Sequence, residues 1–173
     1  PLFLVSPNCT VEQMIAIKAL SAARKGKVSG YSDHYIVDGD GDDFLIRNDK
    51  SANRAGLTAL DIDTSRDGFA QALNDADLLV NFNNDLLRGE ANGAFVEKLA
   101  SLTVIAVSSH DNTLTRQATI AFPVSSYSEY GGTIINQDQI VQRFSAAVGK
   151  NDPAPNMIDV VRLLGGTTTD EAA

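Results

Sequence analysis

The stretch that decides the fold is ADLLVNF (76–82), followed by the two further apolar stretches LTVIAV (102–107) and ATIAFP (118–123). Short continuous apolar runs of this kind are typical of strands that are covered on both faces. Between the first two stretches, residues 91–100 place apolar side chains at helical spacing. Strands that alternate with helices favour right-handed crossovers and a mainly parallel sheet. The predicted fold class is therefore α/β, with an open Rossmann-like sheet and helices on both faces.

The N-terminal part shows the same order of strand and helix. Residues 2–6 are an apolar run, and Thr10 and Gln13 have the spacing of a capping box that begins a helix. Gly26 is predicted to end this helix in the left-handed conformation. Residues 27–31 are a candidate second strand. Because an apolar strand begins at the first residue, we expect the chain to be part of a longer polypeptide.

These patterns divide the chain into three regions. Residues 1–123 form the Rossmann-like domain, which contains a long loop over residues 31–67. Residues 124–166 form a C-terminal appendage of a hairpin and an amphipathic helix. Residues 167–173 are small and polar, and they are predicted to be a disordered tail.

The long loop carries an acidic cluster, Asp38–Asp43, followed by the apolar triplet Phe44–Ile46. An apolar triplet beside charges suits a docking surface, because charges set the register while apolar side chains supply buried area. The alternative is that the triplet belongs to a strand or edge of the domain's own core. The acidic cluster matches part of a calcium loop, but Asp43 stands where that loop needs glycine. A solvated acidic turn is the better interpretation, and no metal site is predicted.

Composition narrows the classes of function. The 173 residues carry a formal net charge of -8, which disfavours binding to nucleic acid or anionic lipid. The single cysteine, Cys9, cannot form an internal disulfide or hold an iron–sulfur cluster unaided. No apolar run approaches the ~20 residues of a membrane span.

An open α/β sheet binds ligands at the carboxyl ends of its strands, here residues 6–10, 81–85 and 108–112. None of these loops is rich in glycine, so a diphosphate cannot approach the backbone closely, and a nicotinamide or nucleoside-triphosphate site is disfavoured. If a cofactor binds, the candidate residues are Asn83, Ser109, His110 and Asn112. Ser109, His110 and Asp111 are adjacent in sequence and cannot adopt the geometry of a hydrolase triad, so no catalytic residue is predicted.

The last third of the chain carries a family resemblance. The strand 118–123 precedes Glu129-x-x-Gly132-Thr133-x-x-Asn136, then Gln142-Arg143-Phe144 and finally Asp-Pro-Ala-Pro at 152–155. This order resembles the molybdopterin oxidoreductase superfamily, most of all the branch of the large iron–sulfur subunit of bacterial NADH:quinone oxidoreductase, respiratory complex I. Asn83 matches an asparagine that touches the pterin nucleotide in that superfamily, but the neighbouring family glycine and proline are absent here.

The resemblance implies a scaffold domain that serves respiratory electron transport inside a larger oxidoreductase and catalyses nothing alone. It implies iron–sulfur clusters elsewhere in the parent chain, no cofactor in this part, and a place in the cytoplasm, peripheral to the inner membrane. The implied partners are the remainder of the parent subunit and other subunits of the complex. One alternative is a fragment of a true molybdenum enzyme, similar to formate dehydrogenase, that binds a pterin guanine nucleotide. Another is a stand-alone α/β protein that binds a small ligand.

Overall fold

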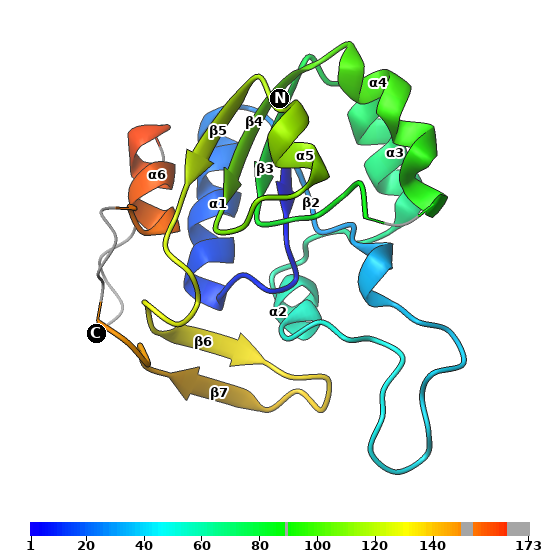
Figure 1. Cartoon of the computed structure of the whole chain (residues 1–173), viewed down its shortest axis with the longest axis vertical. Helices are drawn as coiled ribbons and strands as arrows, with labels where there is room; N and C mark the ends of the chain where they lie inside the picture. Colours follow the sequence, from blue (N-terminus) through cyan, green and yellow to red (C-terminus); the bar gives the residue numbers. More distant parts are fainter. Residues whose placement is uncertain (89, 150–153, 166–173) are drawn as a thin grey trace.

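The structure is a computed structural model that describes residues 1–88, 90–149 and 154–165. Its centre is a five-stranded sheet in the order β2-β1-β3-β4-β5, with every neighbouring pair parallel (Figure 1). The strands are β1 (Leu2–Val5), β2 (Lys27–Ser29), β3 (Leu78–Phe82), β4 (Thr103–Ser108) and β5 (Ile120–Pro123). The predicted α/β class and the parallel arrangement are confirmed. The predicted tail, residues 167–173, lies outside the described residues.

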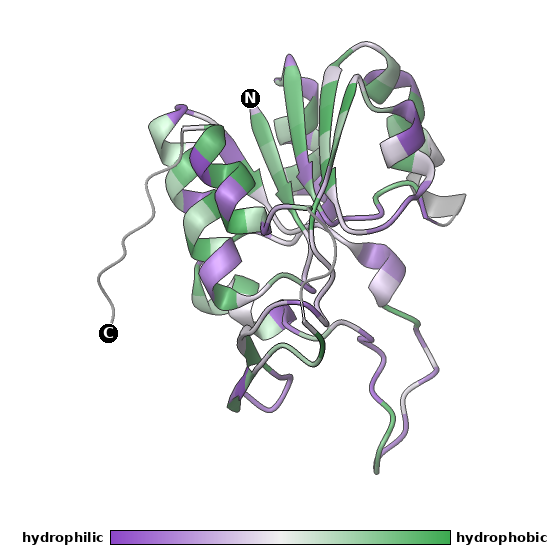
Figure 2. Ribbon diagram, turned by 60° about the vertical axis from the view of Figure 1, so that its left-hand side comes forward, coloured by the Kyte–Doolittle hydropathy of each residue, from purple (hydrophilic) through white to green (hydrophobic). Residues whose placement is uncertain are grey.

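Helices cover both faces of this sheet. The first face carries α1 (Val11–Ala23), α2 (Arg54–Ala59) and α6 (Met157–Leu163), and the second carries α3 (Arg66–Asn74), α4 (Val96–Ala100) and α5 (Thr113–Gln117). Alternate strand residues supply the two cores, so that Phe3 and Val80 pack on the first face and Leu4 and Leu79 on the second. Figure 2 shows the apolar residues gathered along the strands and on the helices beside them. No helix in the described part of the chain has the length and apolar character to cross a bilayer.

The ends of α1 confirm one expectation and correct another. The capping box is present, because Thr10 and Gln13 each bond the other's backbone N–H through their side chains. At the other end Lys25, rather than Gly26, takes the left-handed conformation with a φ of 53°. Gly26 N–H donates to Ser21 O (2.8 Å) and Lys25 N–H to Ala22 O (3.1 Å), which is a Schellman motif. A Cβ on Gly26 would lie 2.7 Å from Pro1 O, so this glycine is needed for its close approach to β1.

Three other segments differ from the sequence prediction. The predicted helix 91–100 begins as a 3-10 helix, η2 (Glu90–Phe95), before it continues as α4. Strand β5 was expected among the covered strands, but it lies at the sheet edge and its residues are exposed. The long loop is also more structured than expected, because it contains a short 3-10 helix, η1 (Asp33–Tyr35), and all of α2.

The C-terminal segment forms the predicted hairpin, β6 (Gly132–Ile135) and β7 (Val141–Phe144), and the predicted helix α6. Met157, Val160 and Val161 of α6 enter the same core as α1. The hairpin is attached to the body through buried Asn53, whose Nδ2 donates to Cys9 O (2.7 Å) while its Oδ1 accepts from Ile135 N–H (2.7 Å). One side chain therefore joins the loop after β1 to the hairpin.

Candidate functional site

The candidate site lies where β1, β3 and β4 end at the same edge of the sheet. In this strand order, β1 and β3 are neighbours whose connections leave in opposite directions, and ligands of open α/β sheets bind at such a point. The residues after β3 and β4 supply most of the site. Asn83 follows β3 directly and has a left-handed backbone with a φ of 52°, a strained conformation for a residue other than glycine.

The strained backbone of Asn83 brings three of the predicted residues together. Asn83 Oδ1 accepts hydrogen bonds from Ser109 N–H (2.8 Å) and from Ser109 Oγ (3.2 Å). Ser109 Oγ also lies 2.8 Å from His110 Nδ1. The loops after β3 and β4 are thus fastened to each other, and the acceptor of Asn83 is occupied by protein groups.

Asn112, the fourth predicted residue, has a local structural role. It forms a capping box with Thr115 at the start of α5, with N···O distances of 2.8 and 2.9 Å. Asp111 beside it is bound by Arg116 Nε at 2.9 Å and Nη2 at 2.8 Å, and Thr115 Oγ1 donates to it at 3.0 Å. These bonds from Arg116 and then Thr115 lower the pKa of Asp111. In a hydrolase triad the carboxylate bonds the histidine, whereas the carboxylate of Asp111 is bonded by Arg116 and Thr115.

All four predicted residues line one cavity of about 360 Å³. Its other lining residues are Asn8, Tyr35, Asp85, Arg88, Ser108, Asp111, Tyr127 and Tyr130. Burial raises the pKa of both Tyr35 and Tyr130, so these phenols stay protonated and can donate hydrogen bonds. Asn8 Nδ2 donates to Tyr35 Oη (2.8 Å), which holds Tyr35 at the end of β1. Amides, hydroxyls and aromatic rings dominate the lining, with Arg88 as its one arginine.

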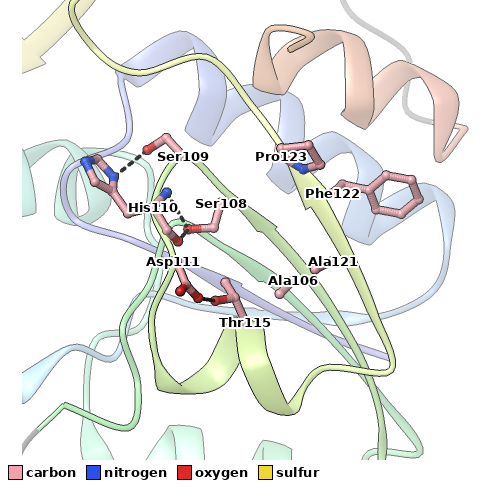
Figure 3. A pocket seen from close by; sticks show the side chains of 9 residues that line it. All are labelled: Ala106, Ser108, Ser109, His110, Asp111, Thr115, Ala121, Phe122 and Pro123. Atoms are coloured by element: carbon pink, nitrogen blue, oxygen red, sulfur yellow. Dashed lines mark hydrogen bonds between the residues drawn. The ribbon is translucent and has the colours of Figure 1, made fainter.

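A second hollow of about 280 Å³ lies on the other side of the β4 loop, toward β5. It shares Ser108, Ser109, His110 and Asp111 with the first cavity (Figure 3). Figure 3 also shows that Phe122 points away from His110. The small side chains of Ala106 and Ala121 line the space between them.

The loop after β1 also carries Cys9, the single cysteine of the chain. Burial raises the pKa of Cys9 to about 12, although a hydrogen bond with the Ser6 backbone acts in the opposite direction. The thiol is fully buried and stays protonated, which does not suit a nucleophile. Within residues 1–88, 90–149 and 154–165, no three His, Cys, Asp or Glu side chains are grouped to hold a metal ion.

Sequence reasoning did not identify the three tyrosines that line the cavity. Tyr35 comes from the long loop, and Tyr127 and Tyr130 come from the segment after β5. The strand-end rule points only to loops that follow strands directly, and it does not say which distant segment folds over them. Comparison with models of known protein families gave no match, and comparison with curated protein sequences gave none either.

Proposed function

We propose that the chain is the molybdopterin-oxidoreductase-like domain of an NADH:quinone oxidoreductase large subunit, and that it serves respiratory electron transfer as a docking scaffold. The observation that carries this proposal is the exposed apolar tip of the long loop. Phe44, Leu45 and Ile46 are 92%, 77% and 45% exposed. The alternative that these three residues belong to the domain's own core is therefore wrong, and the docking interpretation is supported.

The tip has a defined local conformation that keeps its apolar side chains outward. The backbone N–H groups of Phe44, Leu45 and Ile46 donate to Asp42 Oδ1 at 2.9, 2.6 and 2.8 Å. Asp42 N–H in turn donates to Ile46 O at 2.8 Å, which closes the turn. The hydrogen bonds from Ile46, Leu45 and Phe44 lower the pKa of Asp42, so its carboxylate stays ionised and keeps the turn closed at neutral pH. A pre-ordered turn loses less conformational entropy when a partner covers it.

One ion pair joins the base of the loop to the hairpin, and a second lies within the loop itself. Arg47 Nη2 lies 3.2 Å from Asp138 in the hairpin turn, and Lys50 Nζ lies 2.6 Å from Asp40. Exposed ion pairs of this kind contribute little to stability, but they orient the loop. The long loop extends away from the sheet (Figure 1). Phe44 and Leu45 are the most exposed of its large apolar side chains. Such an arrangement fits a partner with an apolar recess.

The site at the sheet edge fits a scaffold better than a pterin nucleotide site. The oxygen of Asn83 is occupied by Ser109, and the strand-end residues 81–85 and 108–112 include no glycine that would let a diphosphate approach the backbone closely. We therefore derive no chemistry through a pterin cofactor. The iron–sulfur clusters of the proposed parent would lie outside this chain.

The proposal is tested by the double substitution of Phe44 and Leu45 by serine in the source cell. Both side chains are exposed, so we expect the variant chain to fold normally, whereas the NADH:quinone oxidoreductase activity of the membranes should fall at least tenfold because the complex no longer assembles. Leu163→Ser removes a similarly exposed leucine from α6 and is the matched control, with activity expected to remain. Full activity in the loop variant would refute the docking role.

A second candidate function is the binding of a small ligand in the 360 Å³ cavity. The observation in its favour is that all four predicted residues line this one cavity at the point where ligands bind open α/β sheets. Titration with guanosine monophosphate, nucleosides and monosaccharides, followed through the amide resonances of Asn83 and Ser109, tests it. Saturable shifts confined to these loops would favour this function, and guanosine monophosphate alone would favour the molybdenum-enzyme alternative.

A further inference from the structure

In the described part of the chain, the outer edges of β5 and β7 are both exposed but differ in character. Beside the outer edge of β5, Val124 N–H donates to Ser108 O (3.2 Å) of β4. Because every second residue of a strand directs its backbone groups to the same side, those of Ile120 and Phe122 also point toward β4. Ala121 and Pro123 then face outward. Because proline has no N–H, Ala121 alone offers a donor at this edge, and Pro123 protects it against pairing with another strand.

The hairpin presents its two edges differently. Asn136 N–H donates to Ile140 O (3.1 Å). This bond determines which residues of β6 and β7 direct their backbone groups toward the partner strand and which direct them outward. On β6 the outward N–H groups belong to Thr133 and Ile135. They donate to Glu12 Oε2 (3.0 Å) and Asn53 Oδ1 (2.7 Å), so this edge is satisfied by side chains of α1 and of the residue before α2.

The second exposed edge belongs to β7. The register pairs Thr133 with Arg143 and Ile135 with Val141, so Val141 and Arg143 also direct their backbone groups outward. Among the described residues these outward groups have no hydrogen-bond partner. β7 forms the outer side of the hairpin (Figure 1), and Val141 and Ile140 are 61% and 55% exposed. Two strands alone make a marginal sheet, and further strands stabilise one.

The sequence of β7 is complementary to itself in the antiparallel direction. In the antiparallel register centred on Gln142, this residue lies opposite Gln142 of a second copy. Val141 of each copy then lies opposite Arg143 of the other, and each of these two pairs exchanges two backbone hydrogen bonds. In the same register Ile140 lies opposite Phe144 of the second copy, and the two glutamine amides can bond each other. The two arginines do not lie opposite one another, so like charges are kept apart.

We propose that β7 pairs antiparallel with β7 of a second copy of this chain, so that the two hairpins form one four-stranded sheet across a twofold axis. This pairing is independent of the proposed function. It uses no group that the monomer needs for its own fold, because the outward N–H and C=O groups of Val141 and Arg143 take no part in the hairpin ladder.

The test compares two proline substitutions that each remove one outward N–H. Val141→Pro acts at the β7 edge, and Ala121→Pro acts at the β5 edge as the matched control; neither N–H serves a ladder in the monomer. Light scattering of the purified full chain should give a mass that doubles with rising concentration for the parent sequence and for Ala121→Pro. The mass of Val141→Pro should stay that of a monomer.

Three results would overturn the proposal: a parent chain that stays monomeric up to about 1 mM, where even weak pairing is populated, a dimer that survives Val141→Pro, or a dimer lost with Ala121→Pro. If Val141→Pro fails to fold, amide exchange of the parent chain decides. The amides of Val141 and Arg143 should be protected at high concentration and exchange at least tenfold faster on dilution, while the inward amide of Gln142 stays protected. Exchange at Val141 and Arg143 that does not change with concentration contradicts the pairing.

Discussion

At the scale of single residues, the partly buried His34 stands out because both of its ring nitrogens are shielded from solvent. Neither ring nitrogen has a hydrogen-bond partner among the described residues, and the ring packs at 4.1 Å from that of Tyr35. Burial lowers the pKa of His34 below its ordinary value of 6.5, with Asp85 acting in the opposite direction. The folded chain therefore favours the neutral imidazole.

This makes His34 a source of acid sensitivity. As the pH falls below 6.5, the unfolded chain takes up the proton before the folded chain does, so the stability present above pH 6.5 is lost as the pH falls toward the folded pKa. His34→Phe removes the titrating group and the two unsatisfied nitrogens. We expect its urea midpoint to equal or exceed that of the parent chain at about pH 7 and to fall less between about pH 7 and about pH 5. A parallel decline of both proteins would show that His34 is not responsible.

The residues of the site were predictable only in part. Asn83, Ser109 and His110 follow strands that the apolar pattern reveals, and parallel strands bring their ends to one edge. Tyr35 of the cavity, and Asn53, which anchors the hairpin, could not be found in this way, because their importance comes from contacts with segments far away in the sequence. Asn53 bridges Cys9 and Ile135. No local pattern encodes such a bridge.

At the scale of elements, the sequence correctly predicted that α1 ends in a left-handed residue, but it assigned that conformation to Gly26 instead of Lys25. Glycine after a helix usually takes the left-handed position, and the sequence places Gly26 close to it. The structure gives that position to Lys25, because Gly26 must lie against Pro1 O and the ring of Phe3. Contact with another strand therefore decided between two adjacent residues, and the sequence alone does not contain that contact.

Two substitutions at this helix end should have opposite effects. Lys25→Gly relieves a left-handed side chain and should raise the free energy of unfolding by about 1 kcal/mol. Gly26→Ala places a Cβ at 2.6 Å from Phe3 Cε2 and should lower it by roughly 1–3 kcal/mol. Urea unfolding measures both. If Gly26→Ala were the harmless change and Lys25→Gly the costly one, the assignment of the Schellman motif would be wrong.

At the scale of the whole molecule, the parallel sheet followed from the alternation of strand and helix patterns. The same reasoning could not place the C-terminal segment, because a hairpin and a helix after the last strand can pack on several faces. In the structure α6 packs beside α1 through Met157, Val160 and Val161. Nor could it decide whether Phe44–Ile46 lie inside or outside, since an apolar triplet suits either place.

The exposed loop tip and the family resemblance support the proposal that this chain works inside a larger respiratory oxidoreductase. Native electrophoresis of gently solubilised membranes and cytoplasm from the source cell, with detection of this chain and an in-gel assay of NADH oxidation, tests it. We predict that the chain migrates in one large species that oxidises NADH and contains iron. A chain that migrates only at its own size or that of its dimer, with NADH oxidation in a species that lacks it, would contradict the claim.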